Sequence, residues 1–197
     1  MTSPLDDFVR KAVADQRLRI YFDTTVILDL LRPDRHSGAQ DSVDLLDLAI
    51  GNKWECAASY FALMEALDIE QENMWFRSRI RAGEDVDRLF RRRRKRDTLS
   101  PQSLGRLSNQ LYRKFVIEVQ DFISWVTFDA KGWELALELA MTSNIRAPDC
   151  IHVATALAAG SNMIITSDEV LRDLAKQHIQ AAKPPELLAS LRRLGTG

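Results

Sequence analysis

The sequence predicts an α/β fold in which a parallel sheet of four to five short strands lies between two layers of helices. Two observations support this prediction. Short apolar runs with the length of strands alternate with helical patterns along the chain, an order that favours parallel strands covered on both faces. A chain of 197 residues, 46% of them hydrophobic, is also long enough to bury one substantial core. We therefore expect a single domain over residues 1–197.

The first half of the chain begins with a strand pattern at residues 18–23. Apolar residues at 26, 27, 30 and 31 then have the spacing of an amphipathic helix, which Pro33 ends. Residues 43–50 predict a second helix that stops at Gly51, and residues 53–59 predict a second strand. Ser59 has the side chain to N-cap the helix that follows this strand.

The second half contains a helical and strongly charged segment at about residues 70–115, in which Ser100 and Pro101 mark a helix start. We interpret this segment as an Arg-rich helical insertion. Residues 122–128 and 163–166 predict the third and fourth strands, and a helix follows each of them. Between these two strands, Pro148 opens a further helix that Gly160 closes.

The composition is that of an ordinary globular protein with 28% charged residues. Its two cysteines, Cys56 and Cys150, have neither metal-ligand nor disulfide-framework spacing, which favours a reducing compartment. The N-terminal residues lack the pattern of a signal peptide, and no apolar run has the length of a membrane span. We therefore expect a cytoplasmic protein with no membrane partner.

The charge is unevenly distributed along the chain. Residues 77–96 contain ten Lys or Arg and three Asp or Glu, a formal charge of +7 that leaves −8 on the remainder of a chain with net charge −1. A polyanion is therefore a plausible partner, although the same run also fits the solvated end of a helix. The candidate RNA-binding residues are Arg91, Arg92, Arg93, Arg94, Lys95 and Arg96.

Four acidic residues lie near predicted strand ends or helix starts. Asp23 ends the first strand, Asp168 follows the fourth strand, Asp149 lies in the first turn of a helix, and Glu65 lies about two turns into another helix. Sites in open parallel sheets form beyond the carboxyl ends of the strands. We therefore predict that these four carboxylates converge on one pocket.

Each of these acids also has a structural interpretation. Asp23 can N-cap the helix after the first strand, and Asp149 can stabilise a helix dipole. Residues 166–169 fit a capping box, which would make Asp168 part of a helix start. Glu65 can simply be exposed on its helix, as most glutamates are.

Four motifs together resemble the PIN-domain nucleases. They are Y-F-D-T-T-V-I-L-D-L-L (21–31), S-Y-F-A-L-M-E (59–65), A-P-D-C-I-H-V-A-T-A-L-A-A-G (147–160) and I-I-T-S-D-E-V-L (164–171). The resemblance covers residues 17–69 and 120–190, and it is carried by the order of the motifs more than by any one of them. The similar subgroup is that of the VapC-like toxin ribonucleases of type II toxin–antitoxin pairs.

This resemblance implies a Mg²⁺- or Mn²⁺-dependent endonuclease that cleaves single-stranded RNA. The family's acidic residues, which bind the metal and act in catalysis, correspond to Asp23, Glu65, Asp149 and Asp168. The chemistry agrees, because hard divalent ions prefer oxygen ligands and relieve the repulsion between clustered carboxylates. Such an ion also lowers the pKa of bound water for attack on a phosphodiester. Thr24 and Thr166 are candidates to hold a carboxylate or a phosphate.

The resemblance also implies an antitoxin protein and a homodimer as possible partners. Two other functions stay open at this point. A PIN module without catalytic activity would bind RNA or protein through the same fold. A phosphohydrolase similar to the haloacid dehalogenases would use Asp23 as its nucleophile, but that signature has a second aspartate where this chain has Thr25.

Overall fold

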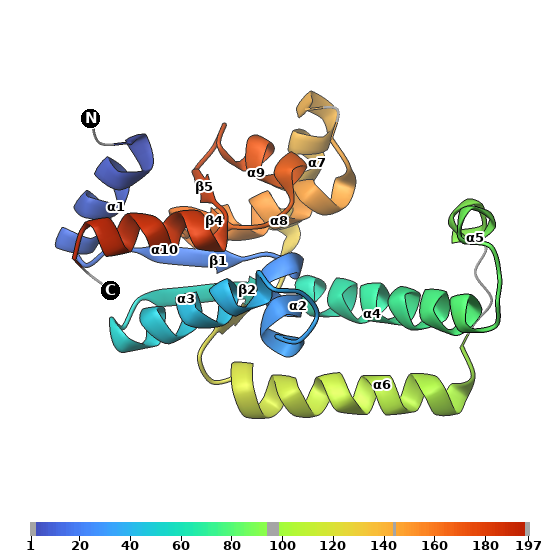
Figure 1. Cartoon of the computed structure of the whole chain (residues 1–197). Coiled ribbons are helices and arrows are strands. Elements are labelled where there is room, and N and C mark those ends of the chain that lie inside the picture. Colours follow the sequence, from blue (N-terminus) through green and yellow to red (C-terminus); the bar gives the residue numbers. More distant parts are fainter. Residues whose placement is uncertain (1–2, 94–98, 144, 196–197) are drawn as a thin grey trace.

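The computed structural model describes residues 3–93, 99–143 and 145–195, and its alternating elements confirm the α/β class (Figure 1). The elements in chain order are α1 (Pro4–Ala14), β1 (Arg19–Phe22), α2 (Thr24–Leu31), α3 (Ala39–Gly51), β2 (Glu55–Ser59), α4 (Tyr60–Arg81), α5 (Val86–Arg92), α6 (Pro101–Lys114), the π-helical turn η2 (Phe115–Val119), β3 (Ser124–Val126), α7 (Ala130–Ser143), α8 (Ala147–Ala158), β4 (Met163–Ile165), α9 (Glu169–Ala175), β5 (Gln180–Ala182) and α10 (Pro184–Arg193).

The five strands form one parallel sheet in the order β3-β2-β1-β4-β5. Four of them lie within the ranges that the sequence predicts, and β5 is a fifth strand of only three residues. In this order, β2 follows β1 on one side of it in the sheet, whereas β5 follows β4 in the opposite direction across the sheet. The connections therefore reverse direction between β1 and β4, and ligands bind at such a switch point in open α/β sheets.

The sheet separates two apolar cores because successive strand residues point to opposite faces. Ile20 and Phe22 of β1 lie in the core that contains residues of α1, α2, α3, α6 and α10. Tyr21, between them, lies in the core that contains residues of α7, α8 and α9. Helices thus cover both faces of the sheet, as predicted. A polar site is therefore expected at the edge of the sheet where the strands end.

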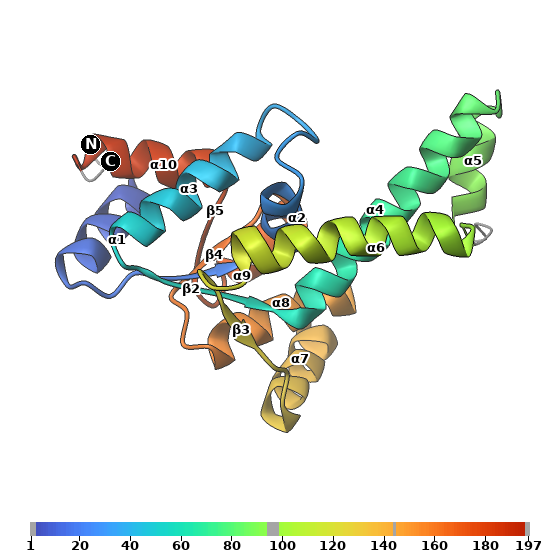
Figure 2. The same ribbon diagram turned by 90° about the horizontal axis from the view of Figure 1, so that it is seen from below.

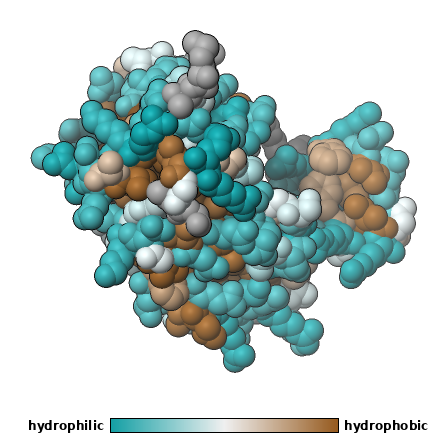
Figure 3. All heavy atoms as spheres, turned by 60° about the vertical axis from the view of Figure 1, so that its left-hand side comes forward, coloured by the Kyte–Doolittle hydropathy of each residue, from teal (hydrophilic) through white to brown (hydrophobic). Residues whose placement is uncertain are grey.

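Helices α4, α5 and α6 form an arm that projects from the body (Figures 1 and 2). Helix α4 begins at the end of β2, runs outward for 22 residues, and is crossed by α6. At the outer end α5 packs on α4 through ring contacts between Phe76 and Phe90, whose centroids lie 5.1 Å apart. Apolar atoms gather on the lobe at the right of Figure 3, and the exposed side chains of Ile80 and Phe90 belong to this end.

The predicted helical segment 70–115 is helical in all three of its described elements. Helix α4 begins at Tyr60 after the predicted Ser59 cap and continues without a break into this segment. Of the predicted RNA-binding residues, Arg91, Arg92 and Arg93 lie at the end of α5, and Arg94, Lys95 and Arg96 lie outside the described residues. Among the helices described, none has both the length and the apolar character that crossing a bilayer requires.

Candidate active site

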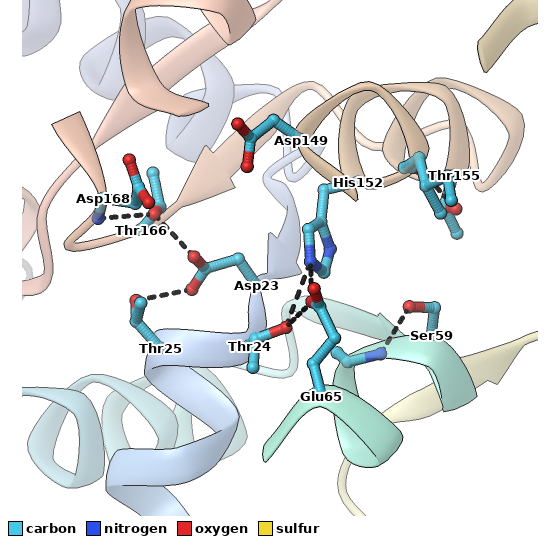
Figure 4. Close-up of polar contacts among 12 residues, drawn as sticks. Asp23, Thr24, Thr25, Ser59, Glu65, Asp149, His152, Thr155, Thr166 and Asp168 are labelled. Carbon is cyan, nitrogen blue, oxygen red and sulfur yellow. Dashed lines mark hydrogen bonds and ion pairs between the residues drawn. The ribbon is translucent and has the colours of Figure 1, made fainter. Parts of the chain in front are cut away.

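All four predicted carboxylates line one cavity of about 160 Å³ at the carboxyl edge of the sheet. Asp23 directly follows β1 and Asp168 follows β4, the two strands that flank the switch point. Glu65 reaches the cavity from α4, and Asp149 reaches it from the first turn of α8 (Figure 4). The sheet and two separate helices therefore bring together acids that are up to 145 positions apart in sequence.

Asp23 both N-caps α2 and faces the cavity. Its Oδ1 accepts hydrogen bonds from the Val26 backbone N–H (3.1 Å) and the Thr25 hydroxyl (2.7 Å). Its Oδ2 accepts a hydrogen bond from the Thr166 hydroxyl (2.6 Å), which comes from the end of the neighbouring strand β4. The capping interpretation of Asp23 is correct, but it leaves the second oxygen at the cavity.

Glu65 is held by two partners at the same oxygen. The Thr24 hydroxyl donates to Glu65 Oε2 at 2.5 Å, and His152 Nε2 lies 2.8 Å from this oxygen. Because a carboxylate only accepts hydrogen bonds, we infer that Nε2 carries the proton. The other ring nitrogen, Nδ1, lies 3.0 Å from the hydroxyl of buried Tyr21. A chain of buried polar contacts therefore runs from Tyr21 through His152 to Glu65.

Asp149 and Asp168 share a partner that sequence reasoning missed. Arg146, the residue before α8, contacts Asp149 through Nε (3.0 Å) and Nη2 (3.1 Å). The same Nη2 lies 3.1 Å from Asp168 Oδ2. Asp168 Oδ1 accepts from the backbone N–H groups of Val170 and Leu171, so Asp168 itself N-caps α9. The predicted capping box starting at Thr166 is therefore wrong.

Burial makes the negative charges of this cavity costly. It raises the pKa of Asp23 above its ordinary value, against the opposing influence of His152 and of the hydrogen bonds from Thr166. Burial likewise raises the pKa of Asp149 in spite of the Arg146 contact. For Glu65 burial acts in the same direction, but the hydrogen bonds from His152 and Thr24 outweigh it and lower the pKa. A bound cation would stabilise the ionised form of all these acids.

The oxygen atoms of this cavity suit a hard divalent cation, since Mg²⁺ binds through carboxylates and water. Within the described ranges, however, no group of three or more His, Cys, Asp or Glu side chains stands ready to hold a metal ion. The carboxylates instead contact protein donors: Asp23 bonds to threonines, Glu65 to His152 and Thr24, and the other two acids to Arg146. A cation would therefore compete with these protein donors.

The PIN-domain family model matches residues 20–177, which is more than half of the chain. The chain belongs to the PIN-domain family. PIN domains are generally nucleases and generally use divalent metals. The matched range contains all four cavity carboxylates as well as the whole arm.

A solved structure supports this fold. The crystal structure of FitAcB from Neisseria gonorrhoeae has a TM-score of 0.52 and 17% sequence identity, over 85% of this chain and 99% of that chain. The structure of FitAB bound to an IR36 DNA fragment has a TM-score of 0.49 and 18% identity, over 84% of this chain and 94% of that chain. Among curated proteins, no sequence matches this chain.

Two side chains of the cavity of this PIN domain were not predicted from the sequence. His152 is three residues after Asp149 on α8, a spacing that places both on one helix face. Arg146 is three residues before Asp149, and its contact with Asp168 spans 22 positions. The helical spacing was visible in the sequence, whereas the contacts with Glu65 and Asp168 depend on how α8 lies against β4 and α4.

Proposed function

We propose that this PIN domain is a Mg²⁺- or Mn²⁺-dependent endoribonuclease that cleaves single-stranded RNA, acting as a VapC-like toxin. The observation that carries the proposal is the convergence of Asp23, Glu65, Asp149 and Asp168 on one cavity at the switch point of the sheet. Few structural roles require four carboxylates around one hollow, since like charges at short distance repel.

Asp23, Glu65, Asp149 and Asp168 would hold the cation through their oxygens. A divalent cation supplies two effects at such a site: it lowers the pKa of water, and it neutralises the charge that develops on the phosphate. Thr166 orients the Asp23 carboxylate, and Thr24 together with His152 orients Glu65. The side chain of Glu65 is 27% exposed, so it is accessible to solvent and suited to accept a proton from the attacking water.

The arm offers a surface for the RNA backbone. A cavity of about 330 Å³ lies between α4 and α6, and a second cavity of about 440 Å³ along α6 shares Gln110 with it. We call this surface the basic groove; its polar residues are Arg32, Glu70, Asn73, Arg77, Ser78 and Arg81, together with Arg106, Asn109, Gln110, Arg113 and Lys114 of α6.

The charges of the basic groove are available to a polyanion. Arg77, Arg81, Arg106 and Arg113 are exposed, and none of them forms an ion pair with a described carboxylate. On α5, by contrast, Arg92 pairs with Glu84 at 3.3 Å and Arg93 pairs with Glu72. Unpaired cations contribute most of the nonspecific affinity for nucleic acid. We propose that the groove and the 91–96 run both contact phosphates, with the groove contributing more.

The groove adjoins the acidic cavity along α4. Ile69 lines the cavity, and Glu70, the next residue, lines the groove. Glu70 is itself paired with Arg32 at 2.5 Å, so its charge does not oppose a polyanion. An RNA strand lying in the groove is thus led along one helix towards the four carboxylates.

Apolar surfaces provide places for protein partners. A cavity of about 220 Å³ between α4 and α6 is lined by Leu63, Met64, Leu67, Leu111 and Tyr112, together with Ser108. We propose this cavity for an antitoxin segment, because Met64 and Tyr112 are exposed there. A homodimer contact is proposed on α7, whose exposed Trp133, Leu137 and Met141 recur at every fourth position.

A non-catalytic PIN module that binds RNA or protein is the second candidate function. The favouring observation is that every carboxylate of the cavity already has a protein partner, so the site is satisfied without a cation. The haloacid-dehalogenase alternative is weaker, since Asp23 is bonded to two threonine hydroxyls and Thr25 occupies the position of the second aspartate.

A cleavage assay tests the proposed function. Labelled single-stranded RNA is incubated with the protein and Mn²⁺, with the protein and EDTA, and with the Asp23→Asn and Glu65→Gln variants. Asp29→Asn is the matched control, because Asp29 is also buried on α2 but bonds to Ser42 and His36 away from the cavity. We expect cleavage only by the wild type and the control, and only with Mn²⁺. Cleavage that persists in EDTA would contradict the proposal.

A further inference from the structure

Arg146 forms hydrogen bonds to the carboxylate oxygens of the acidic cavity that a cation would need. Its guanidinium contacts both oxygens of Asp149 and Oδ2 of Asp168, at 3.0 to 3.1 Å. Among the described residues, Asp149 has no other side-chain partner, and the remaining oxygen of Asp168 caps α9. Asp149 therefore receives its side-chain hydrogen bonds from Arg146, whereas Asp168 is shared between Arg146 and the first turn of α9.

The position of Arg146 allows it to leave. Its side chain is 65% exposed, whereas the carboxylate of Asp149 is 6% exposed. Arg146 is the N-cap residue of α8, and it makes no side-chain capping hydrogen bond there. Rotating this side chain into solvent breaks no contact of the apolar cores and no cap. It is thus a cation that can be exchanged without unfolding of the surrounding elements.

We infer that Arg146 competes with the divalent cation for Asp149 and Asp168, and so sets the cation concentration at which the site fills. This inference rests on the proposed function, since it concerns the same cavity. A guanidinium and a divalent ion cannot share the same carboxylate lone pairs, and their like charges repel at this distance. Each therefore weakens the binding of the other, as thermodynamic linkage requires.

The test is the binding of Mn²⁺ alone, measured by isothermal titration calorimetry without RNA. Arg146→Gln removes the competing charge, and we expect its Kd for Mn²⁺ to fall about tenfold relative to the wild type. Arg146→Lys keeps the charge but loses the two-pronged contact, and we expect an intermediate Kd. Arg19→Gln is the matched control, because Arg19 is an exposed arginine that pairs with Glu55 at the opposite end of β1.

Thermal unfolding gives a second readout that does not depend on cleavage. Without added metal, Arg146→Gln leaves buried Asp149 without its partner, and we expect a lower melting temperature than for the wild type. Saturating Mn²⁺ is expected to remove this difference. If Arg146→Gln fails to fold, the Kd of Arg146→Lys for Mn²⁺ tests the competition, and a value below that of the wild type is expected.

The possible outcomes separate this inference from the proposed function. An unchanged or higher Kd in the Arg146 variants, with normal binding by the wild type, overturns the competition alone. A higher Kd would mean that Arg146 positions the two acids for the metal. Absence of Mn²⁺ binding by the wild type overturns both the competition and the proposed metal-dependent nuclease.

Discussion

The basic groove leads to a quantitative prediction about RNA binding. The perturbation is the triple variant Arg77→Gln, Arg106→Gln and Arg113→Gln, which removes three charges from α4 and α6. These side chains are exposed and have no ion pair with a described carboxylate, so their removal leaves no buried charge behind. We expect the fold to be kept and the affinity for single-stranded RNA to fall for all sequences alike.

The magnitude follows from the number of unpaired cations. On single strands, each phosphate contact contributes about 0.7 to the slope of log K against log salt concentration. Losing three contacts therefore flattens the slope by about 2. The charge-matched variant Arg91→Gln, Arg92→Gln and Arg93→Gln should flatten it by only about 0.7, because two of its arginines are already paired with Glu84 and Glu72.

The assay is fluorescence anisotropy of two labelled single-stranded RNAs of unrelated sequence, over a series of salt concentrations. EDTA in the buffer prevents turnover, so that only binding is measured. Equal slopes for the wild type and the groove variant would contradict phosphate binding by the basic groove. A larger effect of the Arg91 to Arg93 variant would refute it as well, and would assign the RNA to α5.

Three further predictions concern the cavity. Asp23→Asn should raise the free energy of unfolding at pH 7 by about 1 kcal/mol, because it removes a buried charge whose pKa burial raises. The gain in unfolding free energy should shrink towards pH 4, because the raised pKa of Asp23 makes the wild type less stable as pH rises. Equal shifts in melting temperature at pH 7 and pH 4 would contradict this prediction. His152→Ala should lower the free energy of unfolding by about 1–3 kcal/mol and also lower kcat, because Glu65 loses a donor and Tyr21 loses a partner. Chemical denaturation measures the first effect and single-turnover cleavage the second. No change in either would mean that the hydrogen bonds of His152 contribute to neither stability nor catalysis. EDTA should lower the melting temperature of Mn²⁺-saturated protein to that of the metal-free protein.

The sequence was sufficient to predict most of the fold because its local signals agree with one another. The apolar run before Asp23, the Ser59 cap and the glycine at position 160 each act within a few residues, and the structure contains all three features. The strand β5 was not located because its three residues, Gln180–Ala182, carry too little apolar pattern of their own.

The site was predicted less completely, for a physical reason. An acid at the end of a parallel strand faces the sheet edge whatever the remainder of the fold does, so Asp23 and Asp168 could be placed from the pattern. The contacts of Arg146 and His152 depend on the angle at which α8 packs, which no local pattern encodes. The capping and metal interpretations of Asp168 are compatible because its carboxylate has two oxygens. Oδ1 accepts the capping hydrogen bonds of α9, and Oδ2 contacts Arg146 in the cavity.

The most direct test of the four-carboxylate site is anomalous diffraction from crystals soaked in Mn²⁺. We expect a strong peak inside the cavity of about 160 Å³, within bonding distance of oxygens from Asp23 and from at least one of Glu65, Asp149 and Asp168, with Arg146 turned away. A second ion about 4 Å from the first would also agree. Peaks confined to surface carboxylates, with Arg146 still bonded to Asp149 and Asp168, would contradict a metal site formed by the four carboxylates.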